Sequence, residues 1–127
     1  MDPVLRQALD VALRDIRSLG VPEPEIRDTI WIKDPAYPSA VLGSIGGAGT
    51  GISVRLADPQ AERLARVADQ VQDWVIEELW SRHEPTNWPT CPAHPDSHPL
   101  ICVTRDGTAV WTCPIDLTEF SPVGSLR

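Results

Sequence analysis

The sequence lacks long hydrophobic stretches. Its longest apolar runs are only a few residues, too short for a helix that crosses a lipid bilayer, so we expect no membrane association. The first residues, Met-Asp-Pro-Val-Leu-Arg, contain no basic cluster that leads into an apolar stretch. We therefore expect no secretory signal, and a cytoplasmic location.

Basic residues are scarce, and lysine is almost absent. The chain has 18 acidic and 11 basic residues, for a net charge of −7, and Lys33 is its one lysine. Residues 1–83 carry a net −4 and residues 84–127 a net −3, and after residue 83 the basic residues are Arg105 and Arg127. Because both parts repel phosphate, we expect no nucleic-acid partner; an acidic surface suits a basic protein partner. The preference for Arg, with abundant Ala, Pro and Asp, suggests a GC-rich genome such as an actinobacterial one.

Familiar catalytic motifs are also missing. No His-Glu-x-x-His sequence is present, and the glycine-rich stretch 43–51 has no lysine near it. A phosphate-binding loop leads into a helix, whereas these glycines precede an alternating, strand-like segment. We therefore interpret the stretch as a hairpin connection.

The remaining pattern predicts an α+β fold. A length of 127 residues suits one domain. Residues 2–19 have helical apolar spacing behind Asp2 as cap and Pro3 in the first turn, and residues 59–82 begin in the same way with Asp58 and Pro59. Between these helices, strands are expected at 30–32, 39–45 and 52–56. The prediction is two helices on a small antiparallel sheet from residues 28–56.

The second predicted helix has more than one apolar face. One stripe is expected to face the core, and its opposite side is acidic. Ile76 and Trp80 project away from that stripe, so we expect the C-terminal segment to cover them. The stripe consists of Ala61, Leu64, Ala68, Val71, Val75 and Leu79.

Composition changes after residue 84. Five prolines lie within residues 85–99, which excludes a helix there. We divide the chain into an α+β core, residues 1–84, and a proline-rich appendage, residues 85–127, which is expected to pack on the core as one domain.

The appendage concentrates metal-binding residue types. All three cysteines and two of the three histidines lie between residues 91 and 113, and Cys91-x2-His94 has the spacing of a metal knuckle. With Asp106-Gly107 as a two-residue turn, Arg105 faces Thr108 and Cys102 faces Trp111. This register places His98 beside Cys113. The predicted site is a Cys2His2 set for Zn²⁺, whose charge two thiolates balance: Cys91, His94, His98 and Cys113.

Two other residues compete with His98 for the fourth position. Asp116 repeats the two-residue spacing after Cys113, and Cys102 lies diagonally from Cys113 on one face of the predicted hairpin. A third interpretation is that no metal binds and that Cys102 and Cys113 are buried apolar residues.

These residues resemble a zinc ribbon or zinc knuckle. The resemblance covers residues 88–124 and rests on Cys-Pro-x-His, His-Pro-Leu, the Asp-Gly hairpin and Trp-x-Cys-Pro, a pattern similar to that of small actinobacterial and phage proteins. It implies a structural zinc site carried by Cys91, His94 and Cys113. The chain departs from the usual ribbon at Asp116, where a second cysteine would close the site.

Three functions follow from this pattern. The leading hypothesis is a small zinc-binding protein that acts through protein–protein interaction, as a regulator, an adaptor or an immunity-like inhibitor, with no enzymatic activity. The second is a zinc hydrolase with an open coordination position, for which Glu84, Asp96 and Asp116 would be candidate bases. The third, a nucleic-acid-binding ribbon, is disfavoured by the lack of basic residues.

Overall fold

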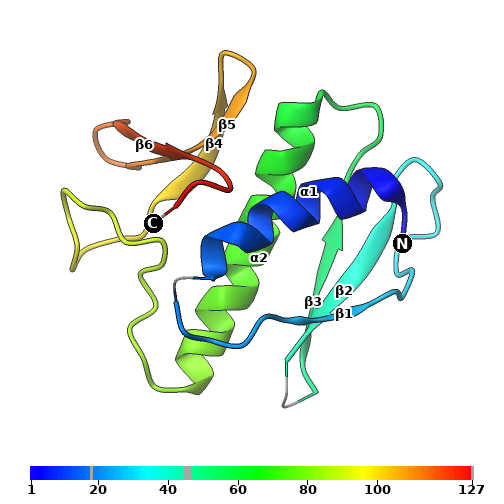
Figure 1. The fold of residues 1–127 in the computed structure, drawn as a ribbon, viewed down its shortest axis with the longest axis horizontal. Coiled ribbons are helices and arrows are strands. Elements are labelled where there is room, and N and C mark those ends of the chain that lie inside the picture. Colours follow the sequence, from blue (N-terminus) through cyan, green and yellow to red (C-terminus); the bar gives the residue numbers. More distant parts are fainter. Residues whose placement is uncertain (18, 45–46, 127) are drawn as a thin grey trace.

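The computed structural model describes residues 1–17, 19–44 and 47–126, and it shows two helices and two small antiparallel sheets (Figure 1). This confirms the predicted α+β class. The helix pair lies in the middle, with one sheet on each side. No helix among the described residues is both long enough and apolar enough to cross a membrane.

The first helix, α1 (Pro3–Leu13), begins as its sequence predicts. The Asp2 carboxylate accepts hydrogen bonds from the amides of Val4 and Leu5, and Pro3 occupies the first turn. The prediction that the helix continues to residue 19 was wrong, because the chain tightens into a 3-10 turn, η1 (Arg14–Ile16), and Ser18 lies outside the described residues. The tighter turn directs Asp15 and Ile16 into the interior, where both are buried.

The first sheet contains β1 (Glu25–Arg27), β2 (Ser39–Gly43) and β3 (Gly49–Ser53) in that order. The glycine-rich stretch does connect an antiparallel hairpin, β2–β3, as predicted, but Gly43 and Gly49 to Gly51 belong to the paired strands themselves. Ile45 and Gly46 lie outside the described residues. The second strand was predicted to reach residue 45, and its described part ends at Gly43.

The strand predicted at 30–32 was wrong. The amides of Trp31 and Ile32 both donate to the Ser39 hydroxyl, so this segment is held by a side chain instead of a neighbouring strand. The predicted strand at 52–56 ends earlier, at Ser53. Beyond it, the Leu56 amide bonds to the loop carbonyl of Ala36, and the Leu56 side chain is exposed.

The second helix, α2 (Gln60–Ser81), has almost the predicted length but a different start. Pro59 is its cap residue and no side chain caps it; Asp58 forms an ion pair with Arg55 at 3.5 Å. The predicted stripe is buried from Ala68 to Leu79 and half-buried at Ala61 and Leu64. Trp74, which lies outside that stripe, is also buried, because α2 packs against both β3 and α1.

The second sheet contains β4 (Ile101–Arg105), β5 (Thr108–Thr112) and β6 (Glu119–Pro122) in that order. The hairpin register is as predicted, with Arg105 opposite Thr108 and Cys102 opposite Trp111. Asp106 and Gly107 both have positive φ, as a tight two-residue hairpin turn requires. The strand β6, which pairs with the other edge of β5, was not predicted from the sequence.

The hairpin packs against α2, as expected, but it does not cover the end of that helix. Both β4 and β5 contact α2, and the buried side chains of the two halves belong to one apolar cluster. Trp80 is 75% exposed, so the expectation that the C-terminal segment covers it was wrong. Two turns earlier on α2, Gln72 bonds to the carbonyls of Trp88 and Leu100, at the two ends of the loop that leads into the hairpin.

Candidate metal centre

Four potential metal ligands converge where the proline-rich loop meets the end of β5. Cys91, His94 and His98 lie in the loop that precedes β4, and Cys113 follows β5 directly. One ligand atom from each residue lies within 4.8 Å of the others. The group contains the four residues that the sequence analysis named, and it could hold a metal ion.

The distances suit a small tetrahedral ion. His94 Nδ1 lies 3.7 Å from Cys91 Sγ and 3.6 Å from Cys113 Sγ, and His98 Nε2 lies 4.0 Å from Cys113 Sγ. With metal–sulfur bonds of about 2.3 Å and metal–nitrogen bonds of about 2.0 Å, a tetrahedral ion separates sulfur and nitrogen ligands by roughly 3.5 Å. These three sulfur–nitrogen pairs are therefore close to the separation that such an ion would require.

A backbone contact orients His98. Its Nδ1 lies 3.1 Å from the carbonyl oxygen of Pro99, the position of an N–H donor. A proton on Nδ1 leaves the lone pair of Nε2 free, and Nε2 is the atom that faces Cys113. The arrangement selects the tautomer that can bind a metal.

The loop that carries Cys91 and His94 is closed by backbone hydrogen bonds. The His94 amide donates to the Cys91 carbonyl, which forms the tight turn of a knuckle. At the base of the loop, Thr90 and Pro99 form a bridge, and the Leu100 amide donates to the Pro89 carbonyl at 2.7 Å. The Trp88–Pro89 peptide bond is cis. The side-chain amide of Asn87 also donates to the Pro95 carbonyl.

The turn after β5 presents Cys113 in a similar way. The Ile115 amide points to Cys113 Sγ at 3.4 Å, and the Leu117 amide donates to the Cys113 carbonyl. Leu117 has a φ of 63°, a left-handed conformation that non-glycine residues seldom adopt. Amide donors toward a sulfur stabilise its thiolate form, which is the form that binds metals.

Burial makes the Cys113 thiol costly to ionise without a counter-charge. Cys91 and Cys113 are fully buried, and burial raises the pKa of the Cys113 thiol, with smaller opposing effects from the amides of Asp116 and Ile115. A bound cation would offset that burial because it stabilises the thiolate directly.

Cys102 and Asp116, the two alternatives to His98, lie outside the group of four. Cys102 is half-buried and packs against the apolar core. Its burial, and then the negative charges of Asp69 and Asp15, raise the pKa of its thiol to about 12. Asp116 lies next to Cys113, but its carboxylate accepts from the Thr118 amide at 3.0 Å. The Thr118 amide and hydroxyl, and then the Cys113 thiol, lower the pKa of Asp116.

Two supporting contacts around the group were not predicted from the sequence. The buried side-chain amide of Gln72, on α2, donates to the carbonyls of Leu100 at 2.7 Å and Trp88 at 3.2 Å, and so holds both ends of the metal-binding loop. Trp88 and Trp111 pack edge to face, with ring centroids 5.9 Å apart. A glutamine on a helix gives no sequence signal for such a contact, since its partners are backbone atoms.

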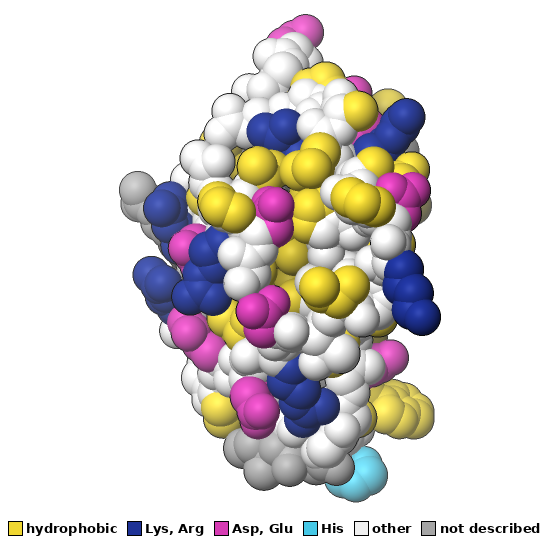
Figure 2. Space-filling view, turned by 90° about the vertical axis from the view of Figure 1, so that its right-hand side faces the viewer, with side chains coloured by type: hydrophobic (Ala, Val, Ile, Leu, Met, Phe, Trp, Pro, Cys, Tyr) yellow, Lys and Arg dark blue, Asp and Glu magenta, His cyan; other side chains and the backbone are white. Residues whose placement is uncertain are grey.

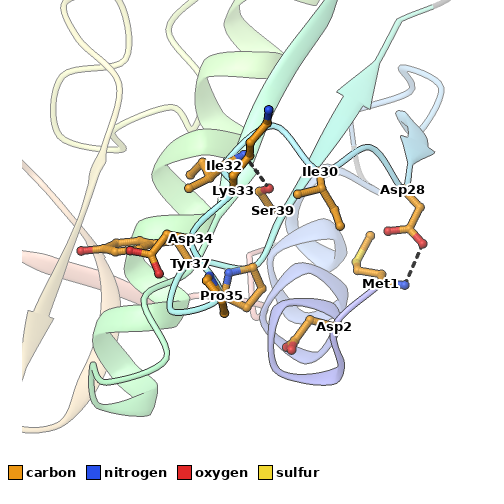
Figure 3. A pocket seen from close by; sticks show the side chains of 11 residues that line it. Met1, Asp2, Asp28, Ile30, Ile32, Lys33, Asp34, Pro35, Tyr37 and Ser39 are labelled. Carbon is orange, nitrogen blue, oxygen red and sulfur yellow. Dashed lines mark hydrogen bonds and ion pairs between the residues drawn. The ribbon is translucent and has the colours of Figure 1, made fainter.

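A hollow of about 440 Å³ lies beside the N-terminus, away from the candidate metal centre (Figure 3). Ile30, Ile32, Pro35 and Tyr37 contribute apolar surface to it, and Asp28 pairs with the terminal amine of Met1. Viewed from this side, hydrophobic side chains gather along the middle of the molecule with acidic ones among them (Figure 2). The hollow contains no cysteine or histidine, so its chemistry differs from that of the four-residue group.

Comparisons with models of protein families, with curated proteins and with solved structures found no match for this chain.

Proposed function

We propose that Cys91, His94, His98 and Cys113 bind one Zn²⁺ ion that stabilises the fold, and that the protein acts by binding another protein. The observation that carries the metal proposal is the convergence of four donor atoms within 4.8 Å from two separate turns. Zinc is favoured because two thiolates and two imidazoles are a common donor set for tetrahedral structural zinc.

A structural role is favoured over a catalytic one. A catalytic zinc keeps a position open for water or substrate, whereas here four protein donors are available. The carboxylate of Asp116, one of the candidate bases, accepts a hydrogen bond from the Thr118 amide. Glu84 and Asp96, the other candidate bases, are exposed.

Protein binding is supported by apolar side chains next to the metal-binding turn. Ile115 is 70% exposed and Leu117 54%, and both lie in the turn that Cys113 anchors. An ordered turn that displays two aliphatic side chains loses little entropy when it binds. The net charge of −7 favours a partner with basic groups around its apolar contact.

Metal content and coordination test this proposal. Mass spectrometry of the native protein is expected to show one zinc per chain. After replacement by Co²⁺, the visible spectrum is expected to be that of a tetrahedral thiolate site and to be unaffected by added anions. A spectrum that changes with anions would support an open, catalytic site, and folded native protein without metal would contradict the proposal.

A further inference from the structure

A buried carboxylate on η1 connects the first helix to the metal-binding half of the chain. Asp15 is 1% exposed and accepts three hydrogen bonds. The donors are Trp111 Nε1 at 2.8 Å, the Gly124 amide at 2.8 Å and the Leu126 amide at 3.0 Å. All three come from residues more than ninety positions away in the sequence.

The three donors belong to two different segments of the chain. Trp111 lies on β5, two residues before Cys113, and packs against Trp88, three residues before Cys91. Gly124 and Leu126 belong to residues 123–126, here called the C-terminal tail. Oδ2 of Asp15 accepts from both Trp111 and Gly124, so one oxygen atom joins the tail to the strand that ends at a candidate metal ligand.

The tail fits closely on α1. The Val123 amide donates to the Ala109 carbonyl of β5, and the Val123 side chain is buried. At Gly124 the backbone has a φ of 95°, and an added Cβ would lie 2.8 Å from the side chain of Val11. A glycine is therefore required for the tail to lie this close to the helix.

We propose that metal binding and docking of the C-terminal tail are coupled through Trp111 and Asp15, so that loss of the metal releases the tail. This inference rests on the proposed zinc site and assigns it a regulatory role. Without the ion, the loop and β5 lose their common anchor, and Trp111 no longer holds the carboxylate that the tail amides need. Coupling between two sites is reciprocal, so releasing the tail weakens metal binding by the same factor.

Two variants release the tail without changing a metal ligand. Asp15→Asn replaces one acceptor oxygen by an NH2 donor, which cannot accept from all three partners. Gly124→Ala introduces a contact with Val11 and a strained φ. Each has a matched control: Asp10→Asn on the exposed side of α1, and Gly20→Ala, where φ is 73° but no atom lies within 4 Å of the added Cβ.

The first experiment measures zinc affinity for the five proteins by competition with a chromophoric chelator. Asp15→Asn and Gly124→Ala are expected to bind zinc more weakly than wild type, by roughly 5- to 150-fold, the range of typical coupling energies. Both are expected to keep the Co²⁺ spectrum of an intact four-ligand site, and the two control variants are expected to keep wild-type affinity.

The second experiment follows amide hydrogen exchange in the wild-type chain with and without zinc. Removing zinc is expected to speed exchange at Gly124 and Leu126 much more than at Ser53 of β3, whose amide donates to the side chain of Gln70 on α2. This measurement does not depend on how well any variant folds.

The outcomes separate the two proposals. Wild-type protein that binds no zinc overturns both. Wild-type protein that binds zinc, with tail amides equally protected in the metal-free state or with unchanged affinity in both tail-releasing variants, overturns the coupling alone.

Discussion

At the scale of single residues, the three cysteines have different surroundings. Cys91 and Cys113 are fully buried, and each sulfur lies within 4 Å of an imidazole nitrogen. Cys102 is half-buried and lies outside the four-residue group. The difference matters because only sulfurs that bind the metal add metal-binding free energy to folding.

We predict that Cys91→Ser and Cys113→Ser lose zinc and lower the free energy of unfolding far more than Cys102→Ser does. The expected loss for the first two is several kcal/mol, since metal binding is coupled to folding. Cys102→Ser is expected to cost on the order of 1 kcal/mol, through changed packing. Zinc content and urea denaturation measure both effects. Equal loss of zinc from all three variants would identify Cys102 as a ligand.

Asp73 lies in a row of acidic side chains on the outer side of α2. Partial burial, then repulsion from Asp69 and from Glu77, raise the pKa of Asp73 above 3.8. A raised pKa in the folded state means that the protonated group favours folding and that this benefit disappears as pH rises through the raised value. At neutral pH the Asp73 carboxylate is therefore unfavourable.

We predict that Asp73→Asn raises the free energy of unfolding near neutral pH by about 0.2–0.5 kcal/mol for each relieved repulsion. The gain is expected to shrink as pH falls through the raised pKa of folded Asp73 and to be absent below 3.8, where the wild-type group is protonated in both the folded and the unfolded state. Urea denaturation of both proteins as a function of pH measures it. Asp10→Asn is a control of opposite sign, since Asp10 pairs with Arg6 at 3.3 Å. A stability difference that does not depend on pH would contradict the electrostatic explanation.

At the scale of elements, α2 organises the metal-binding loop through one side chain. Gln72 satisfies two buried carbonyl groups, at Trp88 and Leu100, with one amide nitrogen. Replacing it by an apolar residue of similar length leaves both carbonyls without this donor. Buried acceptors that lose their partner cost about 1–3 kcal/mol.

We predict that Gln72→Met lowers the free energy of unfolding by about 1–3 kcal/mol and weakens zinc binding. Gln7→Met, at an exposed position of α1, is the matched control and is expected to change neither quantity. Thermal unfolding with and without zinc, together with the chelator competition, measures both. If Gln72→Met affected stability but not zinc affinity, the contact would support the core alone.

Sequence patterns predicted some elements better than others, for physical reasons. Apolar spacing predicted both helices, and the Asp-Gly turn predicted the register of β4 and β5, because these signals are local. The residues 30–32 have strong β-propensity, yet the Ser39 hydroxyl holds their backbone. A contact between a side chain and a backbone segment leaves no periodic trace, so a false strand was expected at 30–32. The true strand, β1, has only three residues, too few for an alternating pattern to be recognised.

At the scale of the whole molecule, the sequence predicted which residues meet but not what surrounds them. The Cys91-x2-His94 spacing and the hairpin register together placed four donor residues near one another, and the structure brings their donor atoms within 4.8 Å. The Asp15 contacts with Trp111, Gly124 and Leu126 span most of the chain. A single aspartate within a helical pattern is usually predicted to be exposed. The contacts of Asp15 with the C-terminal half therefore could not be predicted from the sequence.

The extent of unfolding on metal removal tests whether the two halves are one cooperative unit. Trp111 and Trp88, which flank the candidate ligands, are buried in the same apolar cluster as α1 and α2. A buried tryptophan contributes several kcal/mol to the free energy of unfolding, at about 25 cal/mol for each Å² of apolar surface that it removes from water. A loop that loses its metal therefore loses packing against the helices as well.

We predict that chelation lowers the melting temperature of the helices as well as that of the hairpin, and shifts tryptophan fluorescence to longer wavelength as Trp88 and Trp111 meet water. The helical signal in circular dichroism reports α1 and α2, which contain no candidate ligand. A lower melting midpoint of that signal would therefore show that metal binding stabilises the whole domain. Trp80 and Trp31 are both exposed and contribute a fluorescence background; Trp80→Phe removes the part that comes from the more exposed of the two. If chelation instead left the helical midpoint unchanged, the metal-binding half would fold independently. Its exposed Ile115 and Leu117 would then belong to a separate module that binds the partner.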